Sequence, residues 1–579
     1  MLEAFLGRAH DRRTVRPAGL LSAMDDRVPW PTACGLALQH FAIQSIYLVL
    51  PVLMASILSR DPADATRFLC LALLAAALWQ VLQLLTRGPV GSGYPIPGTN
   101  TAATAGGYLL VAAAGAQGEA AFGTAGALVA LTGLAMVLLT FVMRRVRVFL
   151  PNEVAGVVVM LIGVGLLAFG SQRLGLQGAG AAPDPRQLGA FLASLAVMAA
   201  VALSRTRAVP FAVLIGAAMG IPLALALGIG VPNAAAVLAE RPWIAIPTPW
   251  APRFAEVTLA PLVAFLVSIV ALKATALGSL VVVQRAADAG WTLPDPRPIR
   301  RGLLANGIAT MAAGLAGAMC PSPATAAVGL SVATGTLARR IAWLGAGLLV
   351  LAALCPKFVA LFVLMPHAVQ AAMLFYVSGF LMAQGCQLVT ARLLDARRIT
   401  VVAFGLGAGL MEAMAPQTFQ AWVPALASPV SFGALVAFLV NLLTLPLMRQ
   451  RAELGLALDA GAAGSARDWY GRLAGGWGIR ARTEEIGQGA LAEFVQLLRG
   501  RGAETLALTA IRGEDRVELR LAWAGPALPP PRARPHFADL EEGGDAMEGV
   551  MVWLATRQAQ SFTQRATATG TEAMLILED

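Results

Sequence analysis

The sequence predicts an all-α polytopic membrane protein of about 14 transmembrane helices in two inverted seven-helix repeats, followed by a small soluble α/β domain. Of the 579 residues, 57% are hydrophobic and only 13% are charged, about half the charge of a soluble domain. Apolar runs of roughly 18 or more residues recur from Ala33 to Leu447. A Pro-x-Pro-x-Thr pattern occurs twice, starting at Pro95 and at Pro321. These observations predict the spans, their number and their arrangement in repeats.

Arginine clusters separate the apolar runs into hairpins. Because basic loops remain in the cytoplasm, seven hairpins between eight clusters predict about 14 spans with both termini inside. The first 30 residues contain no short apolar stretch before a cleavage site, so we expect no cleaved signal peptide and a location in the plasma (cytoplasmic) membrane. The clusters lie at residues 8–27, 87, 144–147, 205–207, 285–301, 339–340, 392–398 and 449–451.

Several classes of function are excluded by composition. The net charge of +10 comes from residues between apolar runs, which is typical of membrane topology and does not indicate nucleic-acid binding. The five cysteines all lie in apolar segments, without the spacing of a disulfide framework or a metal site. No enzyme constellation, cofactor site or metal site is predicted.

The chain divides into four parts by composition. We expect a cytoplasmic segment at 1–30 and a transmembrane domain at 31–450, with repeats at about 31–230 and 255–450. A flexible linker is predicted at 451–467, because 461–465 is rich in Gly, Ala and Ser.

The remaining residues, 468–579, read as a cytoplasmic two-layer α/β domain. We expect helices at 484–498 and 547–557, a hairpin of strands at 505–511 and 516–523, a Pro-rich loop at 526–535, and strands at 561–565 and 572–577.

The two Pro-containing segments are predicted to interrupt the third and tenth spans. Proline cannot continue a helix, so extended backbone should precede a half-helix that starts near Gly98 and another near Ala324. Such backbone persists at membrane depth only beside protein or a water-filled cavity. Free N–H groups and short polar side chains would then line a site suited to carbonyl oxygens or an anion. The polar side chains are those of Thr99, Asn100, Thr101, Ser322 and Thr325.

Ionisable residues within apolar runs are functional hypotheses by default. Lys273 lies midway along the run 257–283, and it could pair with Glu412, with Asp288 or with a substrate anion. A structural role, with the amine satisfied by neighbouring helices, is the alternative. His40 in the first span either packs structurally or organises the cavity.

Four stretches together resemble the nucleobase–ascorbate transporter family, which contains uracil and xanthine permeases. Gln39-His40 resembles the Gln-His motif of its first span, and 301–317 resembles its ninth span. The stretch 329–340 is similar to its signature segment and the loop after it. The stretch 355–366, followed by Gly379 and Gly385, is similar to its eleventh and twelfth spans. The resemblance covers about 31–451.

The resemblance implies 14 spans in two inverted repeats, a core domain and a gate domain, elevator-like alternating access and homodimers. It implies a substrate between the third and tenth spans, held by a carboxylate of the eighth span and by a Gln or Glu, followed by Asn, in the tenth. In this chain those positions match Thr275 and the pair Ala326-Ala327. Both acidic groups are absent, although each would supply charge-assisted hydrogen bonds of roughly 1.5–3 kcal/mol.

We therefore expect a secondary active transporter for a xanthine- or uracil-like base, with H⁺ or Na⁺ coupling altered or absent. A small-anion transporter on the same fold, or a transporter-like receptor that signals through its tail, is the alternative. The expected partners are the substrate, the lipid bilayer and a second copy of the chain.

The tail resembles, faintly, the anti-sigma branch of the histidine-kinase ATPase fold, with Gly549 and Gly570-Thr571 in place. Ala524-Gly525-Pro526 lacks the adenine-binding Asp, and 493–496 lacks the metal-binding Asn. An assembly or regulatory module without ATP binding is therefore predicted.

Overall fold

The computed structural model describes residues 15–578, except for 147–150, 177–183, 205, 207, 292–293, 391–393, 424–425, 446–449, 514–515, 531–544 and 568–569. The chain forms two compact units, one of Met1–Leu388 with Val402–Phe438 and one of Val389–Val401 with Leu439–Asp579. Part of the Pro-rich loop and several residues of the basic clusters lie outside the described residues, namely Arg8, Arg12, Arg13, Arg147, Arg205, Arg207, Arg392 and Arg449.

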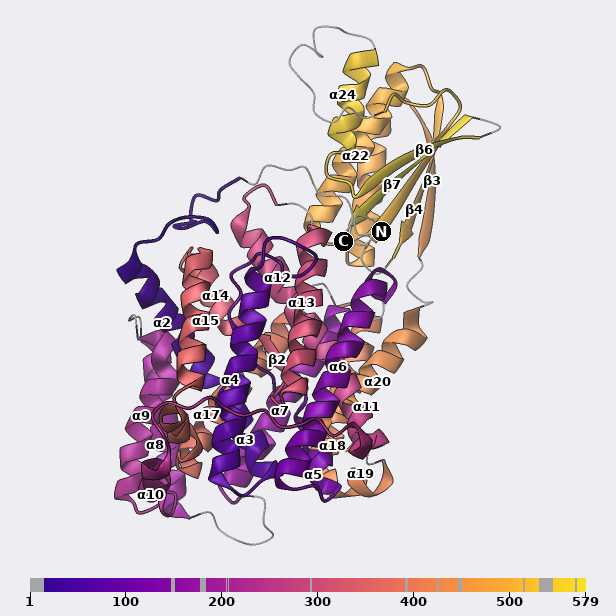
Figure 1. Ribbon diagram of the computed structural model, residues 1–579. Helices are drawn as coiled ribbons and strands as arrows, with labels where there is room; N and C mark the ends of the chain where they lie inside the picture. The colour runs from indigo at the N-terminus through magenta and orange to yellow at the C-terminus, as the bar shows by residue number, and fades with distance from the viewer. Residues whose placement is uncertain are drawn as a thin grey trace. The chain divides into compact units, whose positions relative to one another are not determined.

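The first unit is a helical membrane protein (Figure 1). Within the described ranges, seven helical segments are long and apolar enough to cross a membrane. The number rises to nine if the bent pairs α15 with α16 and α18 with α19 each form one span. The helices are α2 (Trp30–Ile46), α3 (Val49–Leu58), α4 (Pro62–Leu84), α5 (Ala105–Ala113), α6 (Gly118–Val146), α7 (Asn152–Arg173), α8 (Pro185–Leu203), α9 (Ala212–Ala226), α10 (Ala234–Glu240), α11 (Leu259–Val267), α12 (Ile269–Ala287), α13 (Pro296–Leu315), α14 (Thr325–Ala333), α15 (Arg339–Ala353), α16 (Pro356–Val363), α17 (His367–Val389), α18 (Ala396–Met414), α19 (Pro416–Trp422) and α20 (Pro429–Thr444).

Two segments far apart in the sequence have the same order of helix, short strand and nine-residue helix. The first is α4, β1 (Gly98–Asn100) and α5, and the second is α13, β2 (Pro321–Pro323) and α14. The strands pair antiparallel, with Thr99 opposite Ser322. The prolines explain the interruptions, because they lack the N–H that a continuous helix would need.

Close contacts at glycine bring several pairs of helices together at backbone distance. At Gly133 and Gly314 a Cβ would overlap the backbone of the facing helix, so α6 and α13 pack at backbone contact. Gly405 and Gly433 bring α18 and α20 together beside α7 in the same way. We call α4–α6 with α12–α14 the cradle group, and α7, α17, α18 and α20 the wall group.

The N-terminal segment is docked on the first unit. Ser22 pairs with Thr336 in a parallel bridge, and the Leu337 N–H donates to the Ser22 carbonyl at 2.9 Å. Asp25 forms an ion pair with Arg339. The loop after α14 is thereby covered by residues that precede the first span.

The second unit contains a five-stranded antiparallel sheet in the order β3-β4-β5-β7-β6. Its core contains alternate strand residues such as Leu508 and Leu521, with Tyr470, Phe494 and Leu498 from the helices. The elements are β3 (Arg451–Ala457), α21 (Ala462–Trp477), α22 (Ala481–Gly500), β4 (Thr505–Arg512), β5 (Arg516–Trp523), α24 (Asp545–Thr556), β6 (Ser561–Thr567) and β7 (Gly570–Glu578) (Figure 1).

The predicted hairpin, both predicted helices and the last two strands of the tail are confirmed. The flexible linker predicted at 451–467 is wrong. Strand β3 and the first residues of α21 occupy it, because Leu454 and Leu456 pack on the core and Ala462 and Ala466 are buried. Small residues in this segment permit close helix packing, which composition alone does not distinguish from flexibility.

Candidate functional site

The two short strands form a cradle of extended backbone inside the first unit. The Thr101 N–H donates to the Cys320 carbonyl at 3.1 Å, and the Ala324 N–H donates to the Pro97 carbonyl at 2.8 Å. These bonds satisfy the backbone groups that the interruptions leave without helical partners. The half-helix α14 begins at Thr325, beside the predicted Ala324. The start predicted near Gly98 is wrong, because Gly98 is the first residue of strand β1 and α5 begins only at Ala105.

The predicted polar residues of the cradle are brought together, but several are used structurally. Thr99 and Ser322 are opposite each other and both are buried. The Asn100 side chain donates to the Ala72 carbonyl of α4 at 3.2 Å. The Thr101 hydroxyl accepts the Ala103 N–H at 3.1 Å, so it holds the turn into α5.

Two glutamines that the sequence analysis did not single out support β1. The Gln44 Nε2 donates to the Gly98 carbonyl at 2.6 Å and to the Gln80 Oε1 at 2.9 Å. The Gly98 N–H in turn donates to the same Gln80 oxygen at 2.9 Å. The position of both glutamines inside apolar spans was the feature of the sequence that could have indicated this role, because polar side chains are rare there.

The Gln-His pair of the first span contributes one contact to the second half-helix. His40 is buried, and its Nε2 lies 2.9 Å from the Ser331 hydroxyl of α14. Gln39 is half-buried on the neighbouring helical position, about 100° around α2. His40 therefore ties α2 to α14.

The N-terminus of α14 faces two side chains that the sequence analysis missed. Tyr47, between α2 and α3, is hydrogen-bonded to the Thr325 side chain and the Ala326 backbone. The Thr325 hydroxyl donates to the Gln384 Oε1 of α17 at 3.2 Å. Ala326 is half-buried and Ala327 is fully buried. The methyl groups of Ala326 and Ala327 therefore lie beside this polar cluster, at the positions where the resemblance implies side chains that hold the substrate.

The eighth-span positions lie on α12, and their side chains bond elsewhere. The half-buried Thr275 hydroxyl donates to the Ala271 carbonyl of its own helix at 2.7 Å. The buried Lys273 Nζ donates to the Thr140 hydroxyl of α6 at 2.6 Å and to the Leu303 carbonyl of α13 at 3.2 Å. An ion pair with Glu412 or Asp288, which the sequence allowed, does not form between these described residues.

Glu412 lies in the wall group on α18 and is 2% exposed. Its Oε2 has no hydrogen-bond partner among the described residues. No group of three His, Cys, Asp or Glu side chains with metal-site geometry occurs in the part of the chain that the structure describes. The cradle itself is built from amides, hydroxyls and backbone groups.

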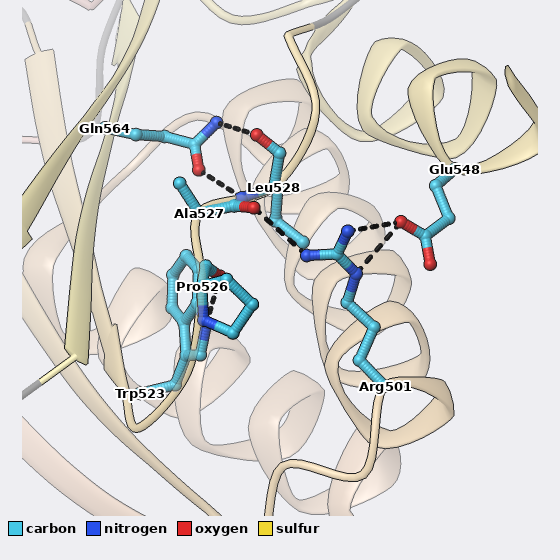
Figure 2. Close-up of polar contacts among 7 residues, drawn as sticks. All are labelled: Arg501, Trp523, Pro526, Ala527, Leu528, Glu548 and Gln564. Carbon is cyan, nitrogen blue, oxygen red and sulfur yellow. Dashed lines mark hydrogen bonds and ion pairs between the residues drawn. The ribbon is translucent and has the colours of Figure 1, made fainter. Parts of the chain in front are cut away.

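In the second unit, a segment after β5 is anchored against the helices (Figure 2). Arg501 forms an ion pair with Glu548 of α24 at 2.6 Å and donates to the Ala527 carbonyl at 3.1 Å. Gln564 of β6 exchanges two hydrogen bonds with the Leu528 backbone, at 2.8 and 3.1 Å. Leu528 is 4% exposed, so these contacts seat it in the core.

The polar groups around the start of α14 in the first unit are neutral hydrogen-bonding groups. The donors and acceptors are neutral, they converge from α14, the region between α2 and α3, and α17, and apolar surface surrounds them. No hydrogen bond of the described cradle residues involves a carboxylate. The chemistry available is therefore binding and orientation.

Comparisons of the sequence with known proteins give a consistent result. The model of the permease family, Xan_ur_permease, matches residues 32–418. The xanthine permease XanP of Escherichia coli K12 is 24% identical over 461 residues, covering 74% of this chain and 95% of that protein. The uric acid permease PucJ of Bacillus subtilis is 26% identical over 426 residues, covering 70% and 91%.

Two solved structures have a fold similar to that of this chain. The structure of SLC26A9 matches with a TM-score of 0.52 at 13% identity, covering 74% of this chain and 67% of that chain. The murine Slc26a9 anion transporter in the inward-facing state matches with a TM-score of 0.50 at 12% identity, covering 75% and 71%. The family model covers both helix–strand–helix segments and most of the helical unit. The chain therefore belongs to the xanthine/uracil permease family of multi-pass membrane permeases.

Proposed function

We propose that this protein transports a nucleobase-like substrate of the xanthine or uracil class by elevator-type alternating access, with proton coupling altered or absent. The observation that carries the proposal is the cradle at β1 and β2, which offers neutral hydrogen-bonding groups and no carboxylate among the described residues. The names of the xanthine and uric acid permeases among its relatives favour purine bases as the first substrates to test.

The architecture proposed for this activity has 14 spans in two inverted seven-helix repeats. The repeated order of helix, strand and helix supports it, and so does the antiparallel pairing of the strands. Short apolar helices such as α9 and α20, and the half-helices, would supply the spans beyond the long ones. We further propose a homodimer in the plasma membrane with both termini in the cytoplasm, and a tail that regulates or assembles the transporter.

Uptake by purified protein in proteoliposomes tests the function. Labelled xanthine, uric acid and uracil should accumulate to their equilibrium level without an imposed pH gradient, because the cradle lacks the acids that would carry a proton. A matched set of empty liposomes measures leakage. Uptake that requires an inward proton gradient would contradict altered coupling.

The same vesicles distinguish the alternatives. Uptake of small anions in place of nucleobases would identify an anion carrier. Binding of a base without any flux would identify a receptor. The direction of the Lys273 amine toward Thr140 and Leu303, and not toward a cradle side chain, favours the neutral base over the anion.

A further inference from the structure

Gln384 places a carboxamide at the cradle from the opposite group of helices. It lies on α17, and its Oε1 accepts the hydroxyl hydrogen of Thr325, the first residue of α14, at 3.2 Å. The next two positions of α14 are Ala326 and Ala327, so α14 presents no amide or acid of its own there. The amide of Gln384 on α17 therefore forms a hydrogen bond to the start of α14 from the wall group.

Packing of α17 on α7 holds this amide in place. A Cβ at Gly385 would stand 2.7 Å from the Gly156 carbonyl oxygen, so the two helices meet at backbone distance. The Ser378 hydroxyl donates to the Gly163 carbonyl at 2.7 Å, two turns earlier on the same face. Gly385 is buried against α7, and the preceding residue is directed to the cradle.

A carboxamide carries an N–H donor and a C=O acceptor side by side. The lactam edge of an oxidised purine or of uracil carries the complementary pair, so one glutamine can bind it through two hydrogen bonds. A carboxylate can only accept hydrogen bonds, and it must take up a proton before it can donate one. Among the described residues, the Gln384 Oε1 accepts the Thr325 hydroxyl, and the Nε2 forms no hydrogen bond that would compete with a base for it.

We propose that Gln384 is the residue that determines substrate specificity, reading an N–H/C=O edge of the base from the wall group. This inference rests on the proposed function. Thr325 and the backbone of the cradle contact the base from the other side. Because the two halves of the site belong to different helix groups, the full set of hydrogen bonds forms only when the groups are together. Because the amide is neutral, binding needs no proton.

The test compares three variants in the proteoliposome assay. Gln384→Ala should raise the KM for xanthine about tenfold or more, because two neutral hydrogen bonds to the base are lost. Gln384→Glu should make uptake depend on pH, since an acid replaces the neutral amide. Gln387→Ala is the matched control, because Gln387 lies one turn along α17 and is exposed. It should leave the KM unchanged.

Competition by N-methylated xanthines separates recognition from a structural role. Wild-type protein should discriminate strongly between xanthine and an analogue whose edge N–H is methylated, and Gln384→Ala should lose that discrimination. Purified variants are first matched for melting temperature.

The failures are distinguishable. Absence of any nucleobase uptake or binding by the wild-type protein would overturn the proposed function and this inference together. Wild-type uptake with an unchanged KM and unchanged discrimination in Gln384→Ala would overturn the inference alone.

Discussion

Lys273 is satisfied inside the helix bundle without a carboxylate. Its Nζ bonds to the Thr140 hydroxyl and the Leu303 carbonyl, on two helices that pack at backbone contact through glycine. The Thr140 hydroxyl also donates to the Met136 carbonyl, so it keeps a partner without the lysine. The amine therefore acts as a polar tie between α12, α6 and α13.

Lys273→Met should preserve transport. Methionine is about as long as lysine, and the groups that accept the lysine hydrogen bonds keep other hydrogen-bond partners. We therefore expect a KM for xanthine within about twofold of wild type and an equal or higher melting temperature. Uptake kinetics and a thermal shift on the purified protein measure both. Lys273→Ala is the comparison, and it should lower the melting temperature because it leaves a cavity. Lost or newly pH-dependent uptake in a stable Met variant would assign Lys273 to transport.

The short strand β1 depends on a glycine at its first residue. Gly98 is so close to α4 that a Cβ would overlap the Ala76 carbonyl oxygen. The strand is further held by Gln44 and Gln80 through the Gly98 backbone. The cradle is thus positioned by α4 as much as by its pairing with β2.

Gly98→Val should abolish uptake while much of the protein still folds. The added side chain must displace β1 from α4, at a cost of about 1–3 kcal/mol, and this moves Thr99 away from its place opposite Ser322. Gly278→Ala on α12 is the control, because nothing lies within 4 Å of an added Cβ. Uptake and melting temperature are measured for both. Normal uptake by the valine variant would show that the cradle tolerates displacement.

On the scale of the whole molecule, the second unit contains the start of α18 together with the sheet. Asp395 precedes α18, and its Oδ1 accepts the Arg398 N–H at 2.9 Å. Its Oδ2 pairs with Arg512 of β4 at 3.0 Å. Burial opposes ionisation, but the Arg398 N–H and the Arg512 charge outweigh it and hold the pKa of Asp395 below its ordinary value. One carboxylate thus caps a helix and binds the sheet.

Removing the charge of Asp395 should lower the stability of the second unit at neutral pH but not in acid. A lowered folded-state pKa means that the ionised group stabilises the fold above its unfolded value of 3.8, and that this contribution is lost as the pH falls below it. A double-mutant cycle of Asp395→Asn and Arg512→Ala should give a coupling of about 0.5–1 kcal/mol at pH 7.

Hydrogen exchange of β4 and of the first turn of α18 provides the measurement. Asparagine can still cap a helix, so Asp395→Asn should spare the first turn of α18, whereas Asp395→Ala should expose it. An equal coupling at pH 7 and below pH 3.8 would contradict the assignment to the ionised pair.

The sequence alone determined much of this protein. Apolar runs and arginine clusters identify a polytopic membrane protein, because a bilayer imposes long apolar helices whatever they pack against. The paired prolines at Pro95 and Pro321 locate the interruptions, because proline disrupts a helix locally. The alternation of apolar and polar residues in 505–523 predicts β4 and β5, because successive side chains of a strand point to opposite faces of the sheet.

Tertiary structure decided which polar residues meet. Lys273 and Thr275 are two residues apart on α12, yet one bonds to α6 and α13 and the other to its own helix. Gln384 and Thr325 come from helices 59 residues apart in sequence, and no local pattern pairs them. Strand β3 was missed because its partner β4 lies about 50 residues onward. Spans and breaks follow from local chemistry, whereas the contents of a site follow from long-range packing that a single sequence does not display.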